Sequence, residues 1–230
     1  MSVASHLGIK TAEYDQQILT FIPFYDEILD QAAQALVALD RPATVLLDLG
    51  TGSGALAARC LKRLPGARAV GIDGDAAMLA MAGKRLGKKL TPVVGNFEST
   101  PFPACDVVTA SFSLHHVPAP RAKARIFAKA FAALRPGGML VDADCMTSSH
   151  PKLQVRDHET WRRHLAVAHG GAGAQKFLDG WAGEDTYFSL DLETALLRRA
   201  GFEVDIAWRR ASFAVIAATK PRRRAGTRAR

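Results

Sequence analysis

The sequence predicts an α/β protein built on a doubly wound sheet of seven strands. An antiparallel last strand, an N-terminal helical cap and an insertion before the last helix complete the expected fold. From residue 43 to residue 145, apolar runs of strand length alternate with amphipathic stretches of helix length, which favours parallel strands joined by right-handed crossovers. The last two apolar runs, 202–208 and 212–220, are only three residues apart. Because that gap is too short for a crossover helix, we expect an antiparallel hairpin.

The N-terminal part is expected to be helical and to lead into a buried strand. Apolar residues in 12–38 recur near the helical period of about 3.6 residues, and Pro23 interrupts them. The first strand, 43–49, is a continuous apolar run, as expected for a strand covered on both faces. Ser53 then stands where a helix N-cap would, before a helix that ends near Pro65.

The same alternation defines the rest of the core. The predicted elements are strands 67–73, 91–95, 105–112 and 138–144 and helices 76–86 and 121–134. After residue 145 the rhythm breaks, and a final amphipathic helix covers 190–202. We expect one domain, 1–220, and a basic disordered tail, 221–230. Within the domain we expect a cap (1–40), a ligand-binding core (43–145), an insertion (147–183) and a C-terminal helix with the hairpin (190–220).

The formal net charge of +8 is concentrated at the C-terminus. The last eleven residues hold six Lys and Arg side chains and no acid, so the domain itself is nearly balanced. Such a tail can bind nucleic acid by charge alone. A solvated disordered end is the simpler interpretation, because the tail lacks apolar residues that could fold. A nucleic-acid partner is therefore expected only through the tail.

Other features point to a cytoplasmic protein without a membrane partner. No apolar run approaches the roughly 20 residues of a membrane helix. The N-terminus lacks a basic segment followed by an apolar one. The cysteines form no CxxC pair and are expected to be reduced core residues: Cys60, Cys105 and Cys145.

The turn after the first strand carries the clearest binding signal. It reads Asp48-Leu49-Gly50-Thr51-Gly52-Ser53-Gly54. Glycines let a ligand approach the main chain, and the next helix offers free N–H groups. Asp73 ends the second strand, where its carboxylate can accept both hydroxyls of a ribose, so we expect its partner to be a ligand. The run Gly50-x-Gly52-x-x-Ala55 also fits a dinucleotide loop, so a nicotinamide enzyme is a competing interpretation.

Four further segments decide between these ligands. The sequence resembles the class I S-adenosylmethionine-dependent methyltransferases over nearly all of 43–220, and this resemblance implies a Rossmann-like sheet. Besides the glycine turn, the matching segments are GID (71–73), GNFESTPFP (95–103), LRPGGMLV (134–141) and the closing hairpin.

The resemblance implies S-adenosyl-L-methionine as cofactor and assigns residues to it. Gly50, Thr51 and Gly52, with Asp48 in the same motif, would hold its amino-acid part, and Asp73 with Gly74 its ribose. Asn96 and Phe97 would bind the adenine, although many members have Asp in place of the Asn. Ser111 would lie beneath the sulfonium.

The N-terminal region is similar to a subgroup that includes carboxy-S-adenosylmethionine synthases. There, a tyrosine after the proline reaches the cofactor carboxylate, and Tyr25 matches it. A carboxylated cofactor would also need an arginine from the inserted region, whereas residues 172–181 contain only Lys176 as a cation.

His115 and His116 follow the fourth strand and are the candidate catalytic residues. Either can be a general base, since imidazole titrates near neutral pH, or both can simply position the loop. No metal site is expected. The other candidate ligands are spaced by six and then five residues, which places them on different faces of a helix: His158, His164 and His169.

Three functions remain open from the sequence. The first is methylation of a small molecule. The aromatic residues of the insertion either wall an acceptor chamber or pack the insertion onto the sheet, and the sequence favours neither: Trp161, Phe177, Trp181, Tyr187 and Phe188. The second is an RNA methyltransferase or a modified-cofactor synthase serving RNA modification. The third is a nucleotide-binding module without catalysis.

Overall fold

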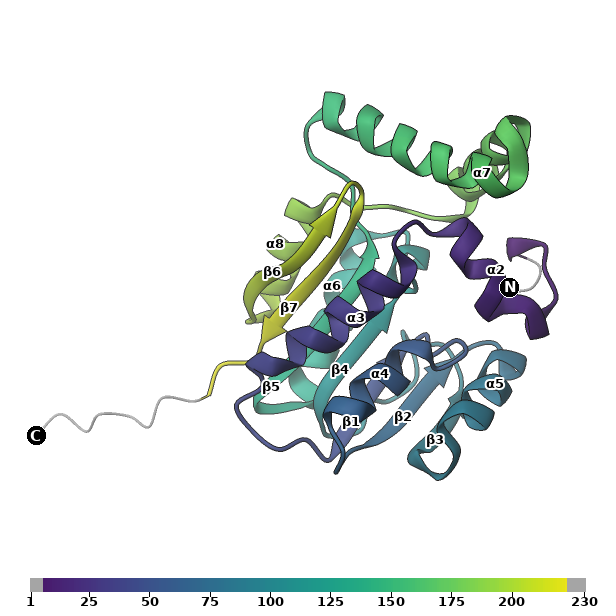
Figure 1. Ribbon diagram of the computed structural model, residues 1–230. Helices are drawn as coiled ribbons and strands as arrows, with labels where there is room; N and C mark the ends of the chain where they lie inside the picture. Colours follow the sequence, from purple (N-terminus) through teal and green to yellow (C-terminus); the bar gives the residue numbers. More distant parts are fainter. Residues whose placement is uncertain (1–5, 223–230) are drawn as a thin grey trace, which may run out of the picture.

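A seven-stranded mixed sheet forms the centre of the structure, a computed structural model that describes residues 6–222 (Figure 1). The strand order is β3-β2-β1-β4-β5-β7-β6. The first five strands are parallel, and β7 runs antiparallel to both β5 and β6. The strands are β1 (Val45–Leu49), β2 (Arg68–Asp73), β3 (Leu90–Val94), β4 (Cys105–Ser111), β5 (Leu134–Cys145), β6 (Glu203–Arg210) and β7 (Phe213–Thr219). The predicted fold, including the hairpin, is confirmed.

Helices cover both faces of the sheet, so successive strand residues enter different cores. On β1, Leu46 packs in the core that includes the cap and α4, whereas Leu47 and Leu49 pack in the core that includes α6 and α8. This alternation follows from the two-residue period of a strand. The helices are α4 (Ala55–Arg63), α5 (Ala76–Leu86), α6 (Pro120–Ala133) and α8 (Leu190–Ala200), with short 3₁₀ turns η3 (Gly87–Lys89) and η4 (Leu114–His116).

The N-terminal cap consists of two helices separated at Pro23, as predicted. They are α2 (Tyr14–Phe21) and α3 (Tyr25–Ala35), flanked by the 3₁₀ turns η1 (Thr11–Glu13) and η2 (Leu36–Ala38). The break is sharp because Phe24 adopts a left-handed conformation, with φ at 63°. As a result, α3 lies along the sheet beside α4, while α2 reaches up towards the insertion (Figure 1).

The insertion is helical and lies across the carboxyl end of the sheet. Helix α7 (Pro151–Glu184) is kinked at Gly170, where φ is 70° and ψ is 167°. The indole Nε1 of Trp161 in α7 donates a hydrogen bond to the carbonyl oxygen of Phe21 at 2.8 Å, which links the insertion to the cap. Figure 1 shows α7 and α2 meeting above the strand ends.

Element boundaries differ from the predictions mainly in the second half of the core. Strand β5 starts at Leu134 rather than at residue 138, because Leu134 already pairs with Cys105 before a register shift in β4. The three cysteines are free and buried, as predicted. Most of the predicted tail, residues 223–230, lies outside the described residues, and the division into domain and tail stays a prediction.

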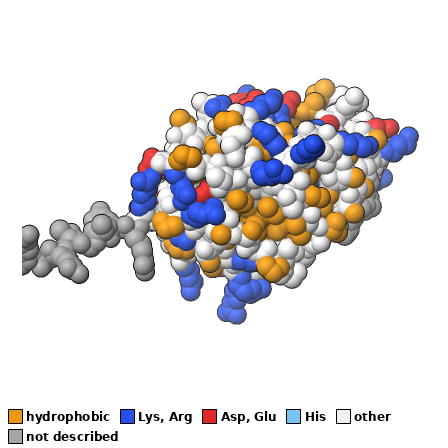
Figure 2. Space-filling model, turned by 90° about the horizontal axis from the view of Figure 1, so that it is seen from below, with side chains coloured by type: hydrophobic (Ala, Val, Ile, Leu, Met, Phe, Trp, Pro, Cys, Tyr) orange, Lys and Arg blue, Asp and Glu red, His pale blue; other side chains and the backbone are white. Residues whose placement is uncertain are grey.

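The face at the amino ends of the parallel strands shows how charge is spread over the domain. Figure 2 shows Lys and Arg side chains there in separate groups with hydrophobic side chains between them. Within residues 6–222, no helix is both long and apolar enough to span a bilayer.

Candidate functional site

The glycine turn lies between β1 and α4, at the carboxyl edge of the sheet. Gly50 and Gly52 have φ angles of 65° and 55°, in the left-handed region that side chains rarely adopt. A Cβ on Gly50 would also lie 2.3 Å from the Cβ of Ser113. Ser113 is fixed in place because its hydroxyl donates to the carbonyl oxygen of Leu49 at 2.9 Å. The backbone path of the turn therefore requires glycine even before a ligand is considered.

Asp73 holds this turn against the end of β2. Its Oδ2 accepts the N–H of Gly52 at 2.7 Å, and its Oδ1 accepts the N–H of Asp75 at 2.8 Å. The sequence predicted only a ligand as partner, and the structure adds these two backbone partners. Each carboxylate oxygen keeps a further lone pair for a ribose hydroxyl. Burial raises the pKa of Asp73, against the effect of the two backbone hydrogen bonds.

Asp48 lies beneath the turn and is almost completely buried. Its Oδ1 accepts a hydrogen bond from the hydroxyl of Thr109 at 2.6 Å. Burial raises the pKa of Asp48 from 3.8 to about 7, against the lowering effect of the Thr109 hydrogen bond. The folded protein therefore binds a proton here more tightly than the unfolded chain does.

The prediction that Ser53 caps α4 was wrong. The N-cap residue is Gly54, with φ at 77° and no side-chain cap, so Ser53 lies one residue too early. Its hydroxyl instead donates to Asp15 Oδ1 of α2 at 2.6 Å and accepts from Arg85 of α5 at 2.7 Å. The side chain thus links the cap, the glycine turn and α5.

The other predicted cofactor residues are distributed along the same edge. Gly74 is exposed beside Asp73, and Ser111 is the half-buried last residue of β4. Asn96 uses its Oδ1 to accept the N–H of Glu98 at 2.7 Å, so the amide shapes its own turn. Phe97 packs against the core on the α6 side of the sheet.

Tyr25 is buried under the cap rather than exposed at the turn. Its hydroxyl is hydrogen-bonded with that of Tyr14, and its ring stacks on Phe112 with centroids 5.6 Å apart. Burial raises the pKa of Tyr14 to about 12 and that of Tyr25 well above its ordinary value. Both hydroxyls are therefore neutral near pH 7 and can donate hydrogen bonds.

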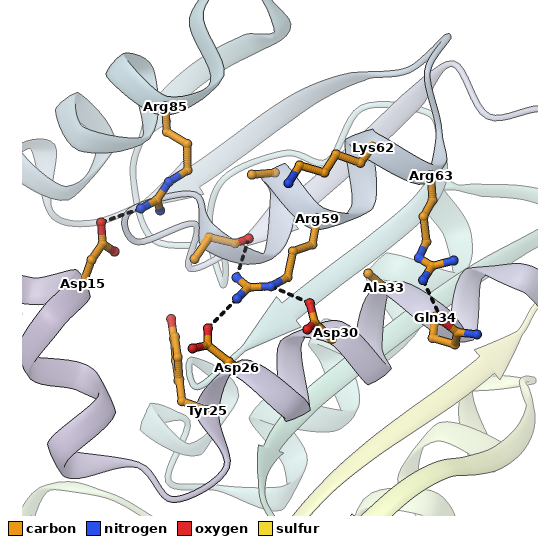
Figure 3. A pocket seen from close by; sticks show the side chains of 12 residues that line it. Asp15, Tyr25, Asp26, Asp30, Ala33, Gln34, Arg59, Lys62, Arg63 and Arg85 are labelled. Atoms are coloured by element: carbon orange, nitrogen blue, oxygen red, sulfur yellow. Dashed lines mark hydrogen bonds and ion pairs between the residues drawn. The ribbon is translucent and has the colours of Figure 1, made fainter.

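A wide groove of about 1060 Å³ runs between α3 and α4 (Figure 3). Arg59 of α4 crosses it and pairs with Asp26 and Asp30 of α3, with the Nε–Asp30 bond at 2.8 Å. Charged side chains thus bridge its walls. Tyr25 lines the groove, but the other predicted cofactor and catalytic residues do not. We therefore place the chemistry at the strand ends and not in this groove.

A smaller chamber of about 80 Å³ lies between the cap, the insertion and the turn after β4. His115 and His116 line it, as do three of the five aromatic residues singled out in the insertion: Trp161, Trp181 and Tyr187. Trp161 and Trp181 are also almost fully buried, so they serve both the chamber and the core. Phe188 lies apart from the chamber, with Lys123 Nζ 4.7 Å from its ring centre.

His115 is oriented by a buried carboxylate at the end of β5. Its Nδ1 lies 2.6 Å from Asp144 Oδ1, and its backbone N–H donates to the other oxygen of Asp144 at 3.2 Å. This contact leaves Nε2 as the ring nitrogen on the chamber side, 3.9 Å from Asp185 Oδ2. Burial lowers the pKa of His115, but the negative charges of Asp144 and Asp185 outweigh burial and raise it above its ordinary value.

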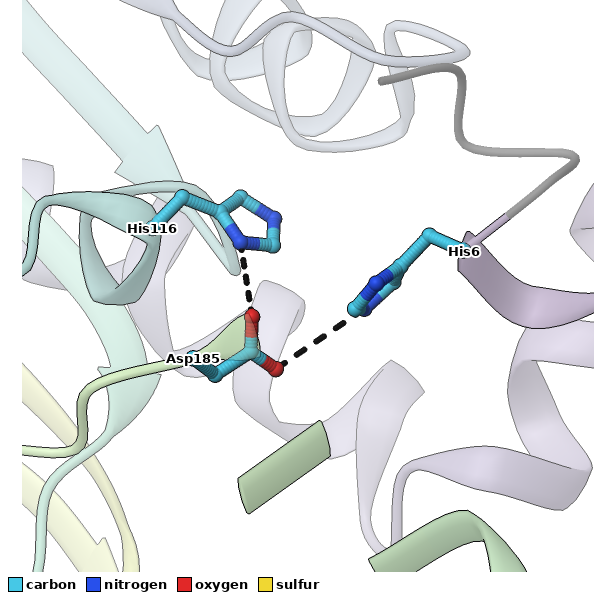
Figure 4. Close-up of side chains that lie close together, drawn as sticks. All are labelled: His6, His116 and Asp185. Atoms are coloured by element: carbon cyan, nitrogen blue, oxygen red, sulfur yellow. Dashed lines mark hydrogen bonds and ion pairs between the residues drawn. The ribbon is translucent and has the colours of Figure 1, made fainter. Parts of the chain in front are cut away.

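His116 belongs to a second cluster, which includes His6 of the N-terminal segment and Asp185 after α7 (Figure 4). His116 Nδ1 lies 2.8 Å from Asp185 Oδ1, and His6 Nε2 lies 3.7 Å from Asp185 Oδ2. Within residues 6–222, these three side chains form a group whose ligand atoms all lie within 4.8 Å of one another. The α7 histidines considered from the sequence point elsewhere: His164 contacts the carbonyl oxygen of Leu19, and His169 contacts Thr20.

Sequence reasoning missed His6, Asp144 and Asp185. Asp144 had a usable signal, since it ends a predicted strand at the same edge as Asp73 and Ser111. His6 and Asp185 had none, because only the packing of the cap against the insertion brings them together.

Comparisons with known proteins agree with this geometry. Residues 46–138 match the family described as "Methyltransferase domain". An uncharacterized methyltransferase of Geobacillus thermodenitrificans is 29% identical over 209 residues, covering 90% of this chain and 88% of that protein. Residues 46–138 therefore form a methyltransferase domain, and the enzyme is an S-adenosylmethionine-dependent methyltransferase.

Solved structures share the fold of this methyltransferase. An O-methyltransferase family 2 protein from Planctomyces limnophilus, in complex with apigenin, superposes with a TM-score of 0.66 at 20% identity, covering 96% of this chain and 62% of that one. Human N-acetylserotonin methyltransferase, in complex with S-adenosylmethionine, gives a TM-score of 0.57 at 20% identity, with 96% and 60% covered. The methyltransferase thus spans about three fifths of either solved chain. Its cofactor is S-adenosyl-L-methionine, as predicted.

The glycine turn provides a first test. Gly50→Ala is expected to lower the free energy of unfolding by roughly 2 kcal/mol or more, because of the positive φ and the contact with Ser113. Gly74→Ala is the matched control, since nothing lies within 4 Å of its added Cβ. Urea unfolding of both variants checks the expectation, and equal stabilities would contradict it.

Asp48 gives a test with a definite pH dependence. The pKa of Asp48 is about 7 in the folded protein and about 3.8 when unperturbed. The free energy of unfolding of the wild type therefore falls as the pH rises between these two values. Asp48→Asn keeps an acceptor for Thr109 and removes the charge. The free energy of unfolding of Asp48→Asn should therefore exceed that of the wild type by an amount that grows with pH, to roughly 4 kcal/mol at pH 8.

Urea unfolding at pH 5 and pH 8 measures this gain. Asp30→Asn serves as the control, since Asp30 is an exposed carboxyl on α3. A gain for Asp48→Asn that is larger at pH 5 than at pH 8 would rule out the buried-charge explanation.

Asp73 provides the third test. Asp73→Ala is expected to weaken S-adenosylmethionine binding and also to destabilise the fold by about 1–3 kcal/mol, because the Gly52 N–H loses its acceptor. Asp75→Ala removes the side-chain cap of α5 but keeps the backbone N–H that Asp73 accepts, so it should leave binding unchanged. Calorimetric titration of both variants with the cofactor, beside urea unfolding, separates the two roles. Unchanged stability of Asp73→Ala would show that the backbone contacts contribute nothing.

Proposed function

We propose that the enzyme transfers the methyl group of S-adenosylmethionine to a polar atom of a small organic acceptor bound in the chamber. The chamber carries this proposal, because aromatic rings and imidazoles enclose it at the carboxyl edge of the sheet. Its volume of about 80 Å³ is far below the roughly 300 Å³ of a full ligand pocket. In this conformation it admits the reacting end of an acceptor rather than a polymer.

The cofactor fits the edge beside the chamber. A Cβ added at Gly74 would meet nothing within 4 Å, and one at Gly52 would first meet Met78 at 3.8 Å, so the backbone there is open to a ligand. Asp73 supplies acceptor oxygens for a ribose, and Thr51 and Asp48 lie under the turn. Ser111 ends β4, and Tyr25 begins α3 and stacks on Phe112, which lines the chamber.

Methyl transfer requires little beyond alignment, since the cofactor supplies an already activated methyl group. The bond from the acceptor atom to the methyl carbon forms as the carbon–sulfur bond breaks, and the electron pair of that bond stays on sulfur. Where the acceptor atom carries a proton, the Nε2 of His115 is the nitrogen that can take it, because Asp144 occupies Nδ1. His116 lines the same wall of the chamber, where its Nδ1 contacts Asp185.

The small-molecule assignment also draws support from structural neighbours. One neighbour was crystallised with apigenin, and the name of another specifies N-acetylserotonin as its substrate. Both molecules are small and aromatic, as the chamber wall would favour. The RNA-related alternative draws on the basic tail and on the N-terminal similarity to carboxy-S-adenosylmethionine synthases, and no contact of the described residues favours it.

The test is a methyl-transfer assay against a panel of small hydroxylated and aminated aromatic compounds. For an accepted compound, His115→Ala is expected to lower kcat by roughly 10²–10⁴-fold while leaving cofactor affinity unchanged. Asp144→Asn, which changes only the group that orients His115, should lower kcat less. His158→Ala, an exposed histidine on α7, is the matched control and should retain wild-type kcat.

Two outcomes would contradict the proposal. Transfer to RNA with none to any small acceptor would remove the small-molecule assignment. Full activity of His115→Ala would remove the histidine from the reaction.

A further inference from the structure

His6, His116 and Asp185 come together from three separate parts of the chain at one wall of the chamber. His6 precedes the cap helices, His116 ends the 3₁₀ turn after β4, and Asp185 follows α7 directly. Figure 4 shows both imidazole rings facing the Asp185 carboxylate. The side chains are 15%, 47% and 2% exposed, so the carboxylate is buried and the opening lies on the His116 side.

We infer that this cluster is a binding site for a divalent transition-metal ion such as Zn²⁺. Two imidazoles and one carboxylate are the nitrogen and oxygen ligands that Zn²⁺ takes in sites that keep a coordination position open. Ligand atoms about 2.0–2.2 Å from a common ion lie roughly 3–3.5 Å from one another. Asp185 Oδ1 lies 2.8 Å from His116 Nδ1 and Asp185 Oδ2 lies 3.7 Å from His6 Nε2, close to that range. All three ligand atoms lie within 4.8 Å of one another, so a bound ion would draw the two imidazoles slightly together.

The surroundings of the cluster resemble the outer shell of a metal site. His6 Nδ1 contacts Glu184 Oε2 at 2.5 Å, which leaves Nε2 for the ion. A carboxylate on the far nitrogen is the usual way in which a protein orients a metal-binding histidine. Asp185 Oδ2 is likewise fixed, because the Tyr187 hydroxyl donates to it at 2.8 Å.

Charge favours a cation at the same place. Asp185 presents a carboxylate, with Oδ1 2.8 Å from His116 Nδ1 and Oδ2 3.7 Å from His6 Nε2. Glu184 and Asp144 add further acids around the histidines. A divalent cation at the cluster would offset the negative charge of these carboxylates.

An ion held here would face the chamber, because His6, His116 and Asp185 all line it. Its open coordination position could hold an oxygen of the acceptor and so fix the acceptor against the cofactor edge. This role rests on the proposed function, whereas the binding site itself does not.

The experiment measures metal binding on the full chain without an affinity tag, after dialysis against a chelator. Zn²⁺ is titrated by calorimetry, and Co²⁺ is followed by the visible absorption of its protein-bound form. Wild type should bind one equivalent of Zn²⁺. His6→Ala and His116→Ala should each weaken binding at least ten-fold, since each removes one of three ligands, and Glu184→Gln should weaken it less.

His158→Ala is the matched control, because it removes an exposed α7 histidine outside the cluster, and it should bind as wild type does. Cofactor titration of each variant shows whether the fold is intact. No Zn²⁺ binding by wild type, or equal binding by wild type and His6→Ala, would overturn the inference. Since neither measurement needs an acceptor, a failed metal site and a failed small-molecule assignment give different results.

Discussion

The pair of hydrogen bonds to Asp73 is the constraint on which the functional edge depends. The turn passes through left-handed glycines, and the N–H groups of Gly50 and Thr51 at its start donate to the carbonyl oxygen of Ile72 at 2.8 and 3.2 Å. Asp73 fixes the middle of the turn by accepting the Gly52 N–H at 2.7 Å, and the Asp75 N–H fixes the carboxylate in turn. Strand β2 thereby sets the position of a loop that belongs to β1 at the carboxyl edge of the sheet.

The fold could be predicted from sequence because local signals agreed with one another. Continuous apolar strands, helical spacing and a short final connection each pointed to the same doubly wound sheet. The site was predictable in part for the same reason. Asp48, Gly50 and Asp73 lie at strand ends, and the parallel arrangement alone brings strand ends to one edge.

What could not be predicted depends on tertiary packing. Ser53 resembles a helix N-cap in the sequence, but Gly54 takes that position before α4, and the Ser53 hydroxyl contacts Asp15 and Arg85 instead. His6 and Asp185 are 179 positions apart, and they meet because the insertion packs onto the cap, where Trp161 donates to the Phe21 carbonyl oxygen. No periodicity or spacing rule covers contacts between an insertion and an N-terminal segment.

The antiparallel β7 has a practical consequence for anything attached to the chain. Because it runs opposite to β5, it delivers Lys220 to Gly138, at the amino end of the strands, and away from the chamber near Asp144. Seven strand residues correspond to roughly 23 Å of separation. A fusion partner or surface anchor joined after Arg222 would leave the chamber accessible, whereas one joined close to His6 would crowd its entrance.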